Sequence, residues 1–221
     1  MSTHLHRDVE TLKKKILGLS AQVEESVQKA LESYYQKDKA LAIEIITADA
    51  EIDQMEIGVE EYCLKILALH QPVAIDLRFI VAVLKMTNDL ERIGDLSVNI
   101  AEQAVFRSRL GWTEIPDDLG VMSDKARSML KRCLDALVNL DADLARRVFN
   151  EDDEVDDLLR RMYAYVKEQL SAHNENMESL MSLLFVSRYL ERIADLATNI
   201  AEDVYYMIKG EIVRHRWKEN R

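Results

Sequence analysis

Acidic side chains recur in pairs four residues apart, and these pairs are the best candidates for chemistry in the chain. The pairs are Asp49/Asp53, Glu91/Asp95, Asp152/Asp156 and Glu191/Asp195. Residues four apart lie on one face of an α-helix, so each pair presents two carboxylates side by side. Clustered carboxylate oxygens are the ligands that hard divalent cations prefer. The spacing therefore indicates a metal site.

The carboxylates lie opposite the apolar side of their helix. At about 100° per residue, Asp95 falls about 40° and Glu102 about 20° from Glu91. Ile93 and Ile100 fall at about 200° and 180°. Like charges four apart repel one another on a helix, so their fourfold recurrence needs a reason beyond helix formation. An exposed, labile cation site is one reason, and a solvated acidic surface is the alternative.

The pairs of each half are expected to lie level across neighbouring helices. If the chain reverses near Pro72, Asp53 is as far from the turn as Glu91, and the other members of the two pairs are level as well. A reversal at residues 173–174 does the same for the second half. The hypothesis is one four-carboxylate site in each half. The first would use Asp49, Asp53, Glu91 and Asp95, and the second Asp152, Asp156, Glu191 and Asp195.

Six amphipathic helices are expected to position these residues. Apolar residues recur at alternating three- and four-residue steps, as in helices with one buried stripe. The stripes predict helices near residues 5–36, 39–70, 75–109, 118–140, 143–172 and 176–209, and only Glu151 in the fifth is out of pattern. The chain holds only 6 Gly and 2 Pro, and neither proline interrupts a stripe. The sequence thus predicts an all-α protein.

The two halves of the chain are copies of one another. The segment LERIGD at Leu90–Asp95 returns as LERIAD at Leu190–Asp195, and NIAE follows in both. A duplicated three-helix unit explains this match. We therefore expect two tandem, pseudo-symmetric three-helix bundles, at residues 1–110 and 118–221.

Composition narrows the class of protein. The net charge of −11 argues against a nucleic-acid partner. Cys63 and Cys133 lie among apolar residues, which predicts buried free thiols in a reducing compartment. The N-terminus lacks the apolar core of a signal peptide, and no apolar run is long enough to span a bilayer. We expect a cytoplasmic protein whose basic C-terminal residues, from Arg214 to Arg221, form a solvated tail.

No motif points to catalysis or to an organic cofactor. The sequence has no P-loop, no GxGxxG, no E-x-x-H and no nucleophile at an interpretable distance from a base. Arg92 and Arg192 are candidates for phosphate binding, but an ion pair with a nearby acid is the preferred interpretation. His70 and His173 are expected at helix C-termini, where a partial positive charge suits the helix dipole.

The doubled LERI[G/A]DL…NIAE motif, the PVAIDLR segment at residues 72–78 and the Asp49/Asp53 pair resemble the PhoU family of phosphate-uptake regulators. The resemblance covers nearly the whole chain. It implies two three-helix bundles and a non-enzymatic negative regulator of the phosphate-starvation response. It also implies contacts with the phosphate ABC transporter ATPase and a sensor histidine kinase.

Some PhoU-like proteins bind multinuclear iron or zinc clusters through E/D-x-x-x-D motifs, and the resemblance assigns iron, zinc or another divalent metal to the eight carboxylates. The second half departs from the family pattern, because SAHNENMESL replaces the proline turn and its DLR. Any role of Asp76 and Arg78 is therefore confined to the first half.

The remaining expectations concern partners and alternatives. We expect a homodimer that meets a membrane only indirectly, through its partners. The alternative function is a metal-dependent phosphate-ester hydrolase that uses the carboxylate clusters. A third is a plain helical scaffold whose acidic faces serve only solubility.

Overall fold

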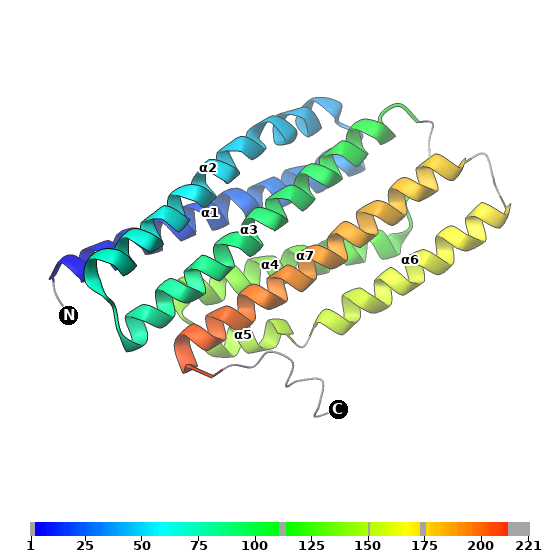
Figure 1. Ribbon diagram of the computed structural model, residues 1–221. Coiled ribbons are helices and arrows are strands. Elements are labelled where there is room, and N and C mark those ends of the chain that lie inside the picture. Colours follow the sequence, from blue (N-terminus) through cyan, green and yellow to red (C-terminus); the bar gives the residue numbers. More distant parts are fainter. Residues whose placement is uncertain (1–2, 111–113, 150, 173–175, 212–221) are drawn as a thin grey trace.

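The structure, a computed structural model, describes residues 3–110, 114–149, 151–172 and 176–211. Within these ranges the chain forms seven α-helices and no strand (Figure 1). The helices are α1 (Thr3–Gln36), α2 (Lys39–His70), α3 (Ala74–Arg107), α4 (Asp117–Asn139), α5 (Ala142–Phe149), α6 (Asp152–Ala172) and α7 (Met177–Lys209). None of the described helices is long and apolar enough to cross a membrane.

The expectation of one helix over residues 143–172 is wrong, because α5 and α6 replace it. The break comes at the acidic residue that is out of the apolar pattern, Glu151. Its carboxylate accepts two hydrogen bonds from the Arg132 guanidinium of α4, one of them at 2.6 Å. Its amide donates to the carbonyl of Val148, three residues back, instead of continuing the α-helical pattern. The other five helices match their expected bounds within about two residues.

The two long C-terminal helices of the bundles, α3 and α7, lie side by side and antiparallel at the centre of the molecule (Figure 1). In the first bundle α1 and α2 pack on α3, and in the second α4, α5 and α6 pack on α7. Ile93 and Ile193, the repeated isoleucines of the LERI motif, are both fully buried. One continuous apolar core joins the bundles. The predicted architecture, two tandem pseudo-symmetric three-helix bundles, is confirmed.

The chain reverses between α2 and α3 as the proline suggested. Asp38 caps the start of α2 by accepting hydrogen bonds from the amides of Ala40 and Leu41 at 2.9 and 3.0 Å. The helix ends at His70, its C-cap residue Gln71 is in the left-handed conformation, and α3 starts at Ala74. The proposed boundary between the two units falls partly on residues 111–113, outside the described part of the chain.

Both cysteines are buried and free, as predicted. Burial raises the pKa of the Cys63 thiol to about 12 and raises that of Cys133 as well. Neither thiol is therefore ionised at neutral pH, and both act as small apolar side chains.

Candidate functional site

The structure brings the two acidic pairs of the first bundle together where α2 and α3 run side by side. Burial raises the pKa of Asp49, and the charges of Asp53 and Asp95 raise it further. Burial likewise raises the pKa of Glu91, and the charges of Asp95, Asp53, Glu56 and Asp49 add to the effect. Glu91 therefore senses both acids of the pair on α2, and Asp49 senses Asp95 on α3. The expected meeting of the two helices' acidic faces is present in this half.

A glycine permits this close approach of the two helices. A Cβ added at Gly94 would lie 3.2 Å from Cγ2 of Ile52 and 3.8 Å from Oδ1 of Asp49. The missing side chain thus leaves room for α2 to lie directly against α3 at the level of the carboxylates. In the second bundle Ala194 occupies the equivalent position and is buried.

We expect Gly94→Val to separate the two acidic pairs. The added methyl groups would overlap Ile52, and overpacking of this kind costs about 1–3 kcal/mol. Because α2 must move outward, the pKa of Asp49 should fall toward its ordinary value, and carbon-detected NMR titration of the carboxyl groups measures this. Gly120→Val is the control, because a Cβ at Gly120 meets no atom within 4 Å. An unchanged Asp49 pKa in Gly94→Val would contradict the role of the glycine.

Sequence reasoning missed one member of the cluster, Glu56. Its pKa is raised by burial and by the charges of Glu60 and Asp53. Glu56 follows Asp53 by three residues and so lies on the same helical face. A search for three-residue as well as four-residue spacing would have found it.

In the second bundle, the acidic pair on α7 repeats the exposure of the acidic pair on α3. Glu191 is half-buried and Asp195 is exposed, as are Glu91 and Asp95 in α3. Asp156 of α6 is half-buried, and the side chain of Asp152 lies outside what the structure describes. The structure therefore places three of the four predicted carboxylates of this half.

The donor chemistry of the first cluster fits a hard or borderline divalent cation, because every candidate ligand is a carboxylate oxygen. Among the residues that the structure describes, no three His, Cys, Asp or Glu side chains converge closely enough to hold an ion as they stand. The eight-carboxylate metal set stays a prediction. Its candidate holders in the first bundle are Asp49, Asp53, Glu91 and Asp95.

Two polar groups singled out in the sequence have found partners. Arg92 lies 3.9 Å from Asp89, consistent with the ion pair that was preferred over phosphate binding. His70, in the last turn of α2, pairs with Asp8 of α1 at 2.8 Å. His173 and the basic C-terminal residues lie outside the described ranges.

The comparisons with known proteins decide the family. The model of the PhoU domain matches the chain twice, over residues 16–104 and 119–204. The chain belongs to the PhoU family. Each match begins in the first helix of a bundle and ends in its last, so each PhoU repeat coincides with one of the two bundles.

Similar proteins match over almost the full chain. A phosphate-specific transport system accessory protein PhoU from Serratia marcescens is 31% identical, covering 97% of this chain and 88% of that protein. A PhoU homolog from Aquifex aeolicus is 34% identical and covers 96% of both chains. The crystal structure of PhoU from Pseudomonas aeruginosa superposes with a TM-score of 0.90 at 31% identity, covering 93% of this chain and 99% of that one. The phosphate transport system regulatory protein PhoU from Streptococcus pneumoniae gives 0.83 at 31% identity, covering 95% and 99%.

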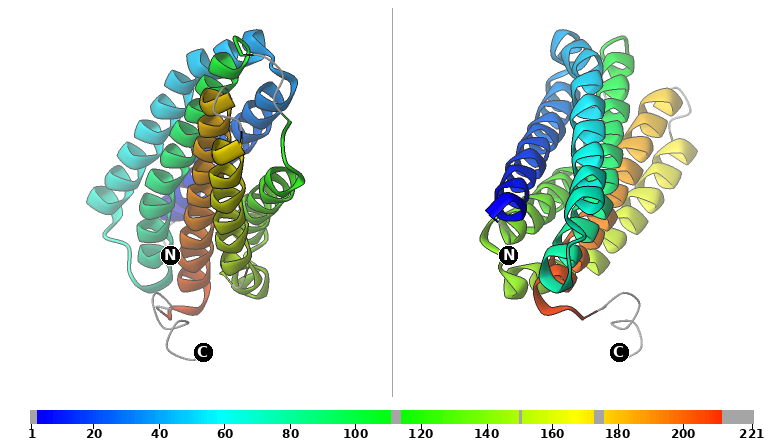
Figure 2. Two further views of the ribbon diagram at one scale, coloured as in Figure 1. Left: turned by 90° about the vertical axis from the view of Figure 1, so that its right-hand side faces the viewer. Right: turned by 60° about the vertical axis from the view of Figure 1, so that its left-hand side comes forward.

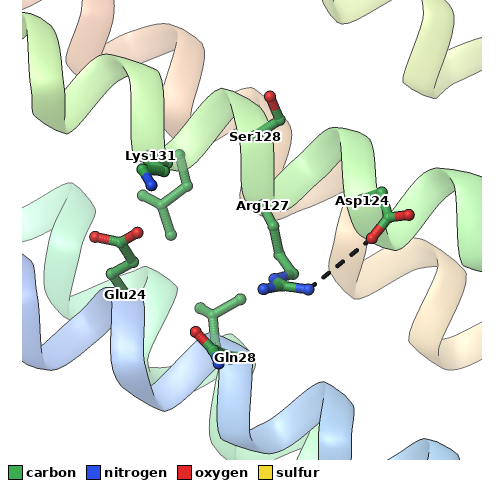
Figure 3. A pocket seen from close by; sticks show the side chains of 8 residues that line it. Glu24, Gln28, Asp124, Arg127, Ser128 and Lys131 are labelled. Atoms are coloured by element: carbon green, nitrogen blue, oxygen red, sulfur yellow. Dashed lines mark ion pairs between the residues drawn. The ribbon is translucent and has the colours of Figure 1, made fainter.

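The two PhoU repeats also enclose a cleft, between α1 and α4. Two adjoining cavities of about 330 and 350 Å³ share Gln28, Asp124 and Arg127. Glu24 of α1 faces Arg127 and Lys131 of α4 across the opening (Figure 3). The lining carries both signs of charge, with Arg127 held 3.9 Å from Asp124. The cleft is therefore polar and of mixed charge, and it is separate from the α2–α3 carboxylates.

Proposed function

We propose that this chain restrains phosphate uptake and the phosphate-starvation response as a non-catalytic regulator. In this proposal it acts by contacting the ATPase of a phosphate ABC transporter and a sensor histidine kinase. It works in the cytoplasm as a homodimer.

The observation that carries the proposal is the near-complete match to proteins named as accessory or regulatory components of phosphate transport. It extends over both repeats and holds at 31–34% identity for the relatives from Serratia marcescens and Aquifex aeolicus. The named relatives support an accessory role, and the two partners are our extension of it.

The carboxylate clusters have a place in this proposal as cation sites. Asp49, Asp53, Glu91 and Asp95 would hold iron, zinc or another divalent ion on the α2–α3 face, and the pair on α7 with its α6 partners would serve the second bundle. A bound cation would neutralise the mutual repulsion that, after burial, raises the pKa of Asp49 and Glu91. Its role would be to hold neighbouring helices at a fixed spacing, and no chemical step is assigned to it.

Deletion of the gene should derepress phosphate-starvation genes in phosphate-rich medium. The expected change is a rise of about tenfold or more in reporter expression, since release of one repressive contact worth about 1.4 kcal/mol already gives a tenfold shift. A plasmid copy should restore repression. Unchanged reporter expression in the deletion strain would contradict the proposed role as a negative regulator.

The hydrolase alternative is separated by an assay on the same purified protein. We expect no turnover of phosphate monoesters above buffer with added Mn²⁺ or Fe²⁺. Turnover that disappears in a variant lacking Glu91 and Asp95 would instead favour the enzyme.

A further inference from the structure

The outward face of α2 carries a row of apolar residues. Ile43, Ile57 and Leu64 are 48%, 45% and 54% exposed, and Ala50 is exposed as well. Successive members are seven residues apart, so the row follows α2 for about 32 Å. Single exposed apolar side chains are normal, but a row of them along one helix marks a contact surface. We call these four residues the α2 stripe.

The α2 stripe lies on the outside of the molecule. The buried residues of α2, such as Ile52 and Val59, face the core, where α2 packs on α1 and α3. Figure 2 (right) shows α2, in cyan, at the front, with the orange and yellow helices of the second bundle further back. The stripe is therefore accessible to another molecule.

The second repeat shows that the three-helix fold does not require this stripe. Asp141 accepts hydrogen bonds from the amides of Asp143 and Leu144 at the start of α5, as Asp38 does at the start of α2. Counted from these two aspartates, the positions equivalent to the stripe are also exposed, but each carries a charge. They are Arg146, Asp153, Arg160 and Lys167. The apolar stripe is thus a property of the first repeat alone.

The seven-residue period indicates that the surface which fits the stripe is another helix. In an α-helix of 3.6 residues per turn, a seven-residue row drifts by about 20° per repeat. Two helices that cross at about 20° keep such rows in contact over their whole length, as in coiled coils. A flat surface or a short loop would leave the ends of the row uncovered.

We propose that the α2 stripe binds the α2 stripe of a second copy of this chain, antiparallel across a two-fold axis. The inference rests on the homodimer of the proposed function and names its contact surface. The stripe is symmetric about its midpoint between Ala50 and Ile57. An antiparallel copy therefore sets Ala50 against Ile57 of the second copy, a small residue against a large one, and Ile43 against its Leu64. A contact of this kind uses one surface twice and closes as a dimer.

The charges beside the stripe favour the antiparallel arrangement. Lys65 would lie within about two residues of the level of Glu44 of the second copy, and both residues are exposed. Lys39 would lie beside the last turn of the second copy's α2, where a cation suits the helix dipole. A parallel pair would instead set Glu61 beside Glu61 and Lys65 beside Lys65, and like charges in contact are unfavourable.

Sedimentation equilibrium of the full chain tests the contact. We expect the wild type to be mainly dimeric at about 50 µM, which corresponds to micromolar affinity. The affinity stays modest because Asp53, beside the midpoint of the stripe, would approach Asp53 of the second copy. Ile57→Ser with Leu64→Ser should weaken the dimer by about tenfold or more, since each copy loses two apolar side chains from the contact.

The matched control is Val121→Ser with Val138→Ser. It removes two apolar side chains of α4 that are 44% and 55% exposed, against 45% and 54% for Ile57 and Leu64. The control should dimerise like the wild type. Both variants should melt within about 4 °C of the wild type, because all four residues are solvent-exposed. A wild type that stays monomeric, or equal dimerisation of the stripe variant and the control, would overturn the proposal.

Disulfide formation tests the antiparallel register. The native cysteines are buried, so new cysteines report on the stripe alone. Oxidation of Ala50→Cys with Ile57→Cys should give a covalent dimer, because each new thiol faces one of the second copy. Ala50→Cys alone should give none, because its two copies would be about 10 Å apart along the helix axes. Cross-linking of the single variant would show parallel pairing and overturn the proposal.

The same variants distinguish a different occupant. If the wild type is monomeric and the stripe variant loses binding to a purified transporter ATPase, the α2 stripe contacts that partner and the proposal fails. Derepression of the phosphate-starvation genes on deletion is independent of these results. It reports on the regulatory role, whereas sedimentation and cross-linking report on the face that joins two copies.

Discussion

Saturating Mn²⁺ is expected to raise the melting temperature of the metal-free protein by about 5–10 °C. A ligand at a hundred times its dissociation constant stabilises the folded state by about 2.7 kcal/mol, and a chain of this size gains about 2–4 °C per kcal/mol. Binding is expected because burial, and then the charges of neighbouring acids, raise the pKa values of Asp49 and Glu91. The folded metal-free state therefore keeps unrelieved repulsion among these carboxylates. Differential scanning fluorimetry after chelation and metal addition measures the shift.

Replacing Asp49 with Asn and Glu91 with Gln should change the melting temperature both without metal and with Mn²⁺. Without metal the variant should melt above the wild type, because the two neutral groups no longer pay for buried like charge. With Mn²⁺ the rise should fall to that contributed by the second bundle alone. Glu51→Gln with Glu61→Gln is the control, because it removes the same charge from exposed positions of α2. Equal metal-induced rises in all three proteins would show that the α2–α3 carboxylates are only solvated surface.

The fold could be read from the sequence because its elements are long and locally determined. Helices of 32 to 34 residues, such as α1 and α2, each repeat their apolar stripe many times, so the period is unmistakable. The one error came where a stripe is short. In α5 eight residues satisfy the pattern, and a tertiary contact between Glu151 and Arg132 decides where the helix stops. Such a contact is between distant parts of the chain and has no periodic signature.

Only those features of the carboxylate site that follow from the geometry of single helices could be predicted from the sequence. The spacing of Glu91 and Asp95 gives their common face, and distance from the turn gives their height relative to Asp53. Neither gives the distance between α2 and α3, which depends on the packing of Gly94 against Ile52.

The two repeats also differ near the end of the first helix of each bundle. The carbonyl of Tyr34, near the C-terminus of α1, is one of the groups for which the helix has no internal partner. Arg107 of α3, only 3% exposed, donates a hydrogen bond from Nη1 to this carbonyl at 2.6 Å. Its guanidinium also lies 5.0 Å from the centre of the Tyr34 ring. The equivalent residue of the second repeat is Met207, which is buried. The first repeat therefore has a charged cap where the second has a buried methionine.

Arg107→Ala should lower the free energy of unfolding by about 3 kcal/mol, and the melting temperature by about 6–12 °C. The loss combines an unsatisfied carbonyl at the end of α1, the lost interaction with the Tyr34 ring and a cavity in the core. Arg107→Met should cost less, about 1–2 kcal/mol, because methionine refills the space and no charge has to be buried, although the hydrogen bond and the cation–π contact with Tyr34 are lost. Urea denaturation followed by circular dichroism measures both changes.

The control for the arginine variants is Arg127→Ala, which removes a surface cation whose pairing distance to Asp124 is 3.9 Å. An exposed pair of this length contributes about 0–0.5 kcal/mol, so the variant should unfold like the wild type. A loss in Arg107→Ala no larger than that in Arg127→Ala would mean that the end of α1 is held by its own backbone hydrogen bonds. The amide of Asp38, which donates to the Ser33 carbonyl at 2.9 Å, is the group that would then suffice. If Arg107→Met destabilised the protein as much as Arg107→Ala, the stabilisation would come mainly from the polar contacts with Tyr34, and packing would contribute little.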